Sequence, residues 1–229
     1  MKNRDHSLDL SRGVAILMMI VFHLIYDLNF FKFTDIPLFD HWLTTYWRYL
    51  IVFLFLSSVG ISLVLAYGQQ FNIAKFSKRM AILGLAALAV SLGTYIVFPD
   101  AWVYFGILHL IWASCLIAVP FARAPNASLL IGVAILSLGY FNLPDLSFLR
   151  TILVETLPEE RSVDFYPLFP WLSLVFIGIY LGHNPWHKKI ITFRSAFIQY
   201  LGQHSLIIYL VHQVLLFGLV ATIYTLINL

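Results

Sequence analysis

Charged residues are scarce in this chain of 229 amino acids. Asp, Glu, Lys and Arg make up 11% of it, whereas hydrophobic residues make up 61%. Average soluble domains have about 25% charged and about 45–50% apolar residues. A soluble protein of this length needs a polar surface that this composition cannot supply, and intrinsic disorder needs even more polar residues. The composition therefore predicts a polytopic membrane protein, with the lipid bilayer as its first partner.

Cysteine and the common catalytic motifs are also nearly absent. Cys115 is the only cysteine, which excludes a disulfide scaffold. There is no G-x-S-x-G nucleophile elbow, no P-loop and no dinucleotide fingerprint. His183 and His187 have ligand-like spacing, but they flank Pro185 and no cysteine or second pair completes a set. We expect no metal. The net charge of +3 gives no reason to expect a nucleic-acid partner.

Long apolar runs are abundant instead. A hydrocarbon core about 30 Å thick needs roughly 20 apolar helical residues. The runs are continuously apolar rather than alternating, which favours helices over the strands of a barrel. We predict an all-α membrane helix bundle, formed as a single domain over residues 1–229, with about seven transmembrane helices. The predicted spans are residues 11–31, 47–67, 80–98, 103–121, 127–141, 168–181 and 205–227.

The basic residues predict the orientation of these spans. If the N-terminus is inside, ten of the 14 Lys and Arg residues fall in cytoplasmic segments, which the positive-inside rule requires. The C-terminus is then outside. These ten are Lys2, Arg4, Arg12, Lys75, Lys78, Arg79, Arg123, Lys188, Lys189 and Arg194.

Three segments between the spans have their own patterns. Residues 69–79 and 186–203 mix aromatic and basic side chains, which is typical of interfacial helices on anionic headgroups. The outer connection 143–166 holds an apolar run at 146–157, which fits a surface helix or a re-entrant lid. Within the second span, Ser57 and Ser58 precede Gly60, a pattern that favours close helix packing over a nucleophile.

Four ionisable side chains lie at membrane depth, where each costs at least about 2.5–3.5 kcal/mol and is a functional candidate. His23 and Asp27 lie in the outer half of the first span, His109 in the outer half of the fourth and His212 in the inner half of the seventh. The i, i+4 spacing of His23 and Asp27 places them on one helix face. A carboxylate there can hold the tautomer of the imidazole, as general bases require. The alternative is that each histidine only bonds a neighbouring helix.

Two other functional classes remain open at this point. The buried set His23, Asp27, His109 and His212 also fits a proton relay, and hence a small proton-coupled transporter or channel. The generic Gly and Ser packing fits a non-enzymatic membrane subunit.

Motifs along most of the chain resemble a known family. Arg12 and His23 are separated by ten residues, as in the first span of membrane acyltransferases, within a run from Leu8 to Ala15 followed by Phe22-His23. The extended form Phe22-His23-Leu24-Ile25-Tyr26-Asp27-Leu28 resembles the small bacterial and archaeal members of the heparan-α-glucosaminide N-acetyltransferase catalytic-domain family. Similar motifs follow in order at residues 53–63, 105–110, 167–171 and 201–212.

The resemblance implies a transferase that modifies glycans. Its donor co-substrate is acetyl-CoA or another acyl-CoA from the cytoplasm, and its acceptor is an extracytoplasmic glycan or amino sugar. It also implies that His23 is the catalytic residue and that Arg12, Lys75, Lys78 and Arg79 bind coenzyme A. Clustered cations suit its phosphates. His23 is about 16 Å beyond Arg12, from eleven residues at about 1.5 Å each, which a pantetheine arm can span.

One departure from the family concerns the catalytic histidine. In the longer animal lysosomal enzyme that residue lies in the loop after the first span, where this chain has His41. His41 therefore competes with His23, and we prefer His23 because the spacing from Arg12 is kept and Asp27 supports it. The expected location is the plasma membrane of a prokaryote, as a multi-pass protein. A homo-oligomer is one alternative for its assembly.

Overall fold

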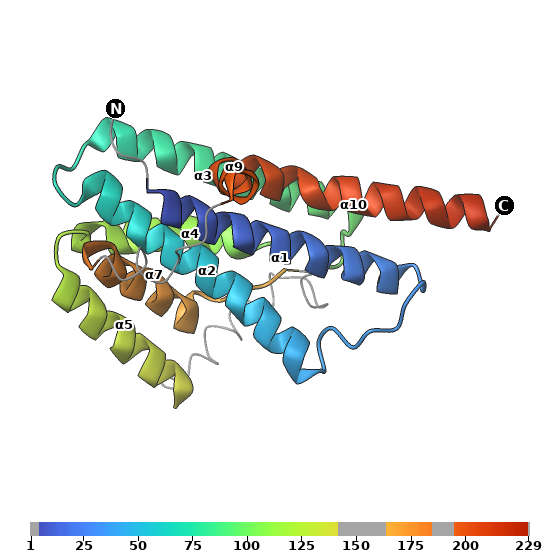
Figure 1. The fold of residues 1–229 in the computed structure, drawn as a ribbon, viewed down its shortest axis with the longest axis horizontal. Helices are drawn as coiled ribbons and strands as arrows, with labels where there is room; N and C mark the ends of the chain where they lie inside the picture. Colours follow the sequence, from blue (N-terminus) through green and yellow to red (C-terminus); the bar gives the residue numbers. More distant parts are fainter. Residues whose placement is uncertain (1–4, 142–163, 185–194, 229) are drawn as a thin grey trace. The chain divides into compact units, whose positions relative to one another are not determined.

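The structure is a computed structural model that describes residues 5–141, 164–184 and 195–228 (Figure 1). The described residues form helices and no β-strand. In chain order these are α1 (His6–Phe30), α2 (Trp42–Tyr67), α3 (Ile73–Val97), α4 (Ile107–Ala118), the 3₁₀ turn η1 (Val119–Phe121), α5 (Pro125–Tyr140), α7 (Leu168–His183), α9 (Ala196–Gln203) and α10 (Ser205–Ile227).

The all-helical prediction is confirmed, and an apolar helix occupies each of the seven predicted positions. Four helices, α1, α2, α3 and α10, are long and apolar enough to cross a membrane. The shorter apolar helices are Ile107–Phe121, Pro125–Tyr140 and Leu168–His183. Seven crossings and the orientation of the termini remain predictions.

The predicted interfacial helix at residues 69–79 is wrong. The side chain of Asn72 accepts a hydrogen bond from the Lys75 backbone N–H (2.9 Å) and caps α3, which then continues without a break through its basic first turns. Of the second predicted interfacial segment, residues 195–203 are described and contain α9, capped by Ser195. The apolar run 146–157 lies outside the described residues.

The fourth helix begins at Ile107 rather than at Val103, because Val103 is bonded to the end of α3. The Ser91 hydroxyl donates to the Val103 carbonyl (2.6 Å), and the Val103 N–H donates to the Thr94 hydroxyl (2.9 Å). These bonds hold Val103 out of a helix. Asp164 then accepts from the Ile107 N–H at the first turn of α4 (3.4 Å).

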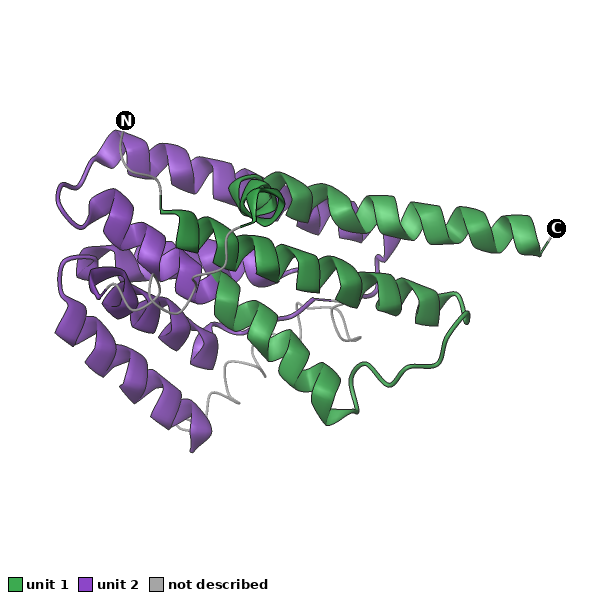
Figure 2. Ribbon diagram, in the orientation of Figure 1, with its two compact units in different colours: residues 1–55, 186–229 green, residues 56–185 purple. Residues whose placement is uncertain are grey.

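The chain forms two compact units (Figure 2): unit 1 contains residues 1–55 and 186–229, and unit 2 contains residues 56–185. In unit 1, α1 packs against α9 and α10. A methyl group on Gly13 would overlap the carbonyl oxygen of Ile198, and one on Gly202 would overlap that of Asp9. Glycine therefore allows the backbones of α1 and α9 to touch. The core of this unit contains Ile16, Met19, Phe22, Leu38 and Ile51.

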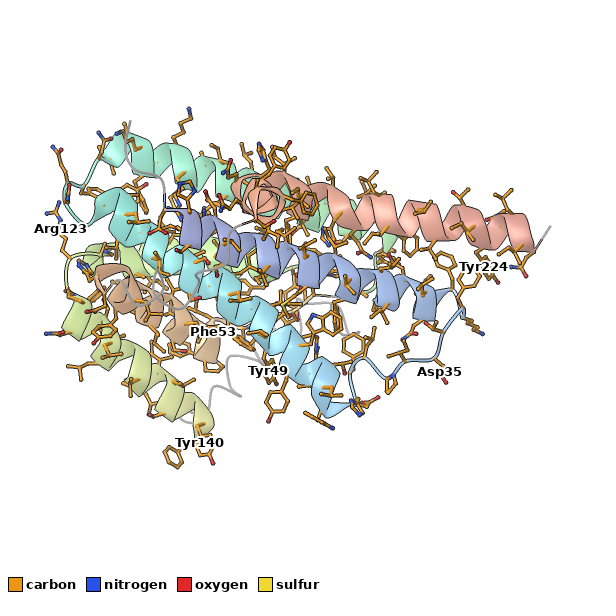
Figure 3. All side chains as sticks on the ribbon, in the orientation of Figure 1. Asp35, Tyr49, Phe53, Arg123, Tyr140 and Tyr224 are labelled. Atoms are coloured by element: carbon orange, nitrogen blue, oxygen red, sulfur yellow. The ribbon has the colours of Figure 1, made fainter. Side chains whose placement is uncertain are left out.

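In unit 2, α5 packs along α7, and α4 packs against α3 and α7. The prediction that Ser57 and Gly60 serve helix packing is confirmed. A Cβ on Gly60 would overlap the Val175 carbonyl oxygen, and one on Gly178 would overlap the backbone of Ser57. At one end of the unit, the Arg123 guanidinium (Figure 3) donates to the Gln69 carbonyl at 2.9 Å.

Much of the apolar surface is exposed, as expected for helices in lipid. Tyr49 and Phe53 on α2 and Tyr140 at the end of α5 point away from the ribbon (Figure 3) and are exposed. On α10, only His212 and Val220 are buried. Near the C-terminus of α10, the ring of Tyr224 packs against that of Phe31, with centroids 5.3 Å apart.

Candidate functional site

The imidazole of His23 lies at the contact between α1 and α10 in unit 1. Asp5 starts α1 by accepting hydrogen bonds from the backbone N–H groups of Ser7 and Leu8 (3.1 and 3.2 Å). His23 follows in the last third of this long helix and is half-buried. Its ring meets the ring of His212 on α10, with centroids 4.9 Å apart and planes inclined by 65°.

His212 is held by its own helix. Its Nδ1–H donates to the Tyr209 carbonyl at 2.6 Å, and its Nε2 is buried without a hydrogen-bond partner among the described residues. The sequence placed His23 and His212 at different depths, but the two rings are neighbours. The physical reason is that α1 begins at His6, earlier than its predicted span, and packs against α9 before it meets α10.

One turn further along α1, the side chain of Asp27 is fully buried. The side-chain amide of Gln213 donates to Asp27 Oδ1 at 2.7 Å. Asp27 Oδ2 and Gln213 Oε1 are both buried without a partner in the described part of the chain. Asp27 is thus bonded to α10 and not to His23, although the two residues have the predicted i, i+4 spacing.

Gln213 was not among the candidates predicted at membrane depth, because these were restricted to ionisable groups. Its signal was nonetheless present, since an amide side chain within an apolar helix of a membrane protein is commonly hydrogen-bonded across helices. Because Gln213 directly follows His212, two consecutive polar side chains of α10 contact α1.

His41, the competing histidine, has a local structural role. It directly precedes α2, and its Nδ1 accepts a hydrogen bond from the Leu43 backbone N–H at 3.3 Å. Its carbonyl accepts from the Thr44 hydroxyl (2.8 Å) and the Thr45 N–H (3.1 Å). These bonds satisfy donors at the start of the helix.

The connection between α1 and α2 is ordered by α1 itself. The side chain of Asn29 donates to the Ile36 carbonyl (2.6 Å) and accepts from the Thr34 hydroxyl (2.7 Å). This connection and the end of α1 together line a hollow of about 350 Å³. Its lining residues include Tyr26, Asn29, Asp35 and Asp40. Tyr26 follows His23 by three residues on α1, a spacing that makes the two side chains neighbours on the surface of that helix.

The four predicted coenzyme A-binding residues are divided between the two units. Arg12 lies on α1 in unit 1, next to the glycine that packs against α9. In unit 2, Lys75 and Lys78 are exposed in the first turns of α3, and the Arg79 guanidinium donates to the Cys115 sulfur at 3.9 Å. Lys75, Lys78 and Arg79 therefore share one helix end, which is typical of a binding surface for an anion.

His109 in unit 2 is fully engaged in structure. The Gly106 N–H donates to its Nδ1 (3.2 Å), so Nε2 carries the proton and donates to the Ser91 hydroxyl (3.2 Å). Ser91 in turn donates to Val103. Both ring nitrogens are occupied, which favours the structural interpretation of His109 over a place in a proton relay.

Within residues 5–141, 164–184 and 195–228, no group of three or more His, Cys, Asp and Glu side chains is arranged to hold a metal ion. Of the histidine pair with ligand-like spacing, His183 donates to the Ala122 carbonyl at 2.9 Å. His187 lies outside the described residues.

Comparison with known protein families gives a match over most of the chain. The family model described as heparan-alpha-glucosaminide N-acetyltransferase, catalytic, matches residues 4–214. No curated protein and no solved structure matches the chain. The matched range includes α1 and the first half of α10, and therefore all four polar residues of the α1–α10 contact.

Proposed function

Because the chain belongs to the heparan-alpha-glucosaminide N-acetyltransferase catalytic family, we propose that it moves an acetyl or other acyl group from cytoplasmic acyl-coenzyme A to an extracytoplasmic sugar or related acceptor. The observation that carries the proposal is the imidazole of His23, half-buried on a helix long enough to cross a membrane. The seven crossings, the cytoplasmic N-terminus, the single domain and the prokaryotic plasma membrane belong to the same proposal.

His23 is the proposed general base. The acceptor hydroxyl or amine attacks the thioester carbonyl carbon and gives its proton to the unprotonated ring nitrogen of His23. The carbon–sulfur bond then breaks, and the proton passes to the sulfur, so that coenzyme A leaves as the free thiol. The new bond is an ester or amide on the acceptor. Asp27 and His212 are the buried polar residues nearest to this chemistry, and His41 remains the alternative base.

The cations are the proposed contacts of the coenzyme A phosphates. Lys75 and Lys78 are exposed at the start of α3, where ammonium groups can form charge-assisted hydrogen bonds with phosphate oxygens. Arg79 and Arg12 are included in the proposed contacts because they are also positively charged and are predicted to lie on the cytoplasmic side. The acceptor is proposed to enter by the hollow that Tyr26 and Asn29 line, because this hollow lies on the same unit as His23.

The first experiment measures transfer by purified protein in nanodiscs, with radiolabelled acetyl-CoA as donor and glucosamine and glucose as first acceptors. We expect acetylated sugar and an equal amount of free coenzyme A. His23→Ala should lower kcat by about 10²–10⁴-fold, the contribution typical of a general base. If wild-type protein transfers no acetyl group to any acceptor, the proposed function is refuted. If His41→Ala loses activity and His23→Ala keeps it, the roles of the two histidines are exchanged.

The second experiment tests the phosphate contacts. Lys75→Gln combined with Lys78→Gln should raise the KM for acetyl-CoA and leave kcat unchanged. With S-acetylpantetheine, which lacks the nucleotide phosphates, the same variant should match the wild type. An equal loss with both donors contradicts a phosphate-binding role.

A further inference from the structure

His212 is the one buried polar residue of α10, and it lies at the contact with α1. The other buried residue of this helix is Val220, while large apolar residues such as Val214, Leu215 and Leu219 are exposed. In a membrane, burying an imidazole costs free energy unless the ring is hydrogen-bonded, so such a residue is usually retained for a function. His212 is therefore a functional candidate on this ground alone.

Hydrogen bonding fixes the tautomer of His212. A backbone carbonyl only accepts, so the 2.6 Å contact with Tyr209 requires a proton on Nδ1. In the neutral ring Nε2 is then an acceptor, and it is buried with no partner among the described residues. The ring of His23 lies beside it, with centroids 4.9 Å apart, and a rotation of either ring would bring an N–H donor to Nε2.

Asp27, the other candidate for orienting His23, is already hydrogen-bonded to Gln213. Asp27 Oδ1 accepts from the Gln213 amide, and the two unpartnered atoms beside that bond, Asp27 Oδ2 and Gln213 Oε1, are both acceptors. One proton on Oδ2 satisfies both at once, because a carboxylic acid and an amide form two parallel hydrogen bonds. The pair is then neutral, which suits full burial at membrane depth.

We propose that His212, and not Asp27, orients His23: His212 Nε2 accepts the N–H of the His23 ring, and Asp27 forms a neutral acid–amide pair with Gln213 that joins α1 to α10. This inference rests on the proposed function. With one ring nitrogen of His23 bonded to His212, the lone pair of the other nitrogen is free to take the acceptor proton. His212 is thus a positioning residue that acts through His23, as the orienting partner of a base does.

The kinetic test compares two substitutions of similar size. His212→Gln keeps an acceptor near the position of Nε2, whereas His212→Met does not. We expect His212→Met to lower kcat about 100-fold with an unchanged KM for acetyl-CoA, and His212→Gln to recover most of that loss. His6→Met, which changes an exposed histidine at the start of α1, is the control and should behave as wild type. Equal losses in His212→Gln and His212→Met overturn the proposal.

A spectroscopic test is independent of activity. Nitrogen NMR of ¹⁵N-histidine-labelled protein in nanodiscs distinguishes protonated from unprotonated ring nitrogens, with His212→Met and His23→Ala used to assign the signals. We expect His212 protonated at Nδ1 alone, and a changed tautomer population of His23 in His212→Met. A His212 protonated at Nε2 overturns the proposal even if the protein is an active transferase. If the protein transfers no acetyl group, the proposed function fails while this measurement still decides the His23–His212 hydrogen bond.

Infrared spectroscopy and the stability of two variants test the acid–amide pair of Asp27 and Gln213. The infrared spectrum of wild-type protein should contain the C=O stretch of a buried protonated carboxyl group that is missing in Asp27→Asn. Asp27→Asn should retain the stability of the wild type, because an amide also forms two parallel bonds with Gln213, and Asp27→Leu should lose it. A carboxylate signal for Asp27, or an Asp27→Asn variant as unstable as Asp27→Leu, contradicts the pair.

Discussion

The glycine at position 202 offers a stringent test of the packing in unit 1. Alanine normally stabilises a helix interior by about 0.8–1 kcal/mol relative to glycine. At Gly202, however, the added methyl group would overlap the carbonyl oxygen of Asp9 on α1. A backbone atom cannot rotate away, so the helices must separate, and overpacking of this kind costs about 1–3 kcal/mol. Separation also lengthens the 3.4 Å hydrogen bond from Gln203 to Asp9, which contributes about 1 kcal/mol.

These terms predict a net destabilisation of about 2 kcal/mol for Gly202→Ala. For a chain of this size that corresponds to a fall in Tm of about 4–8 °C. The matched control is Gly218→Ala on α10, where a Cβ meets no atom within 4 Å and the substitution should be neutral or stabilising. Both are measured by thermal unfolding in the same detergent. A Gly202→Ala protein as stable as Gly218→Ala would refute the α1–α9 contact.

Two other predictions concern the ends of helices. Lys32 has a φ of 59° and follows α1 in a Schellman arrangement, with its N–H bonded to the Asn29 carbonyl, so Lys32→Gly should raise stability by about 1 kcal/mol in thermal unfolding. Lys32→Ala keeps the Cβ and should gain nothing; a similar gain in both variants contradicts the backbone explanation. Ser91→Ala removes partners from Val103 and His109 and should cost about 1 kcal/mol in the same assay, a typical value for a hydrogen bond within a membrane. Thr225→Ala, whose hydroxyl bonds only its own helix, is the control, and an equal effect of the two would argue against the α3–α4 bonds.

The helices were predictable because their apolar runs are long and continuous, but their starts were not. Val103 is as apolar as the residues after it, and only the bonds from Ser91 and Thr94 on another helix hold it out of α4. Such bonds join residues about ten positions apart, so no periodicity reports them. The start of α3 was predicted wrongly for the opposite reason. A local signal was present, the N-cap residue Asn72, but the mixture of aromatic and basic side chains in residues 69–79 led to the prediction of a separate interfacial helix.

The candidate site was predictable residue by residue but not as an arrangement. Histidines and an aspartate in apolar helices are conspicuous because of their cost in lipid. Which of them meet depends on the alignment of α10 along α1, which the sequence does not encode in any local pattern. His212 is therefore beside His23, while His109 serves as a helix cap.

The unbroken start of α3 has a consequence for how the protein responds to its membrane. A helix of 25 residues is about 38 Å long, which exceeds a hydrocarbon core of about 30 Å. If α3 crosses the membrane, the two exposed lysines at its start favour the headgroup region, and the excess length extends into the headgroups or is taken up by tilt. Lipids of different chain length should then change the inclination of α3, within the limits that its packing against α4 allows.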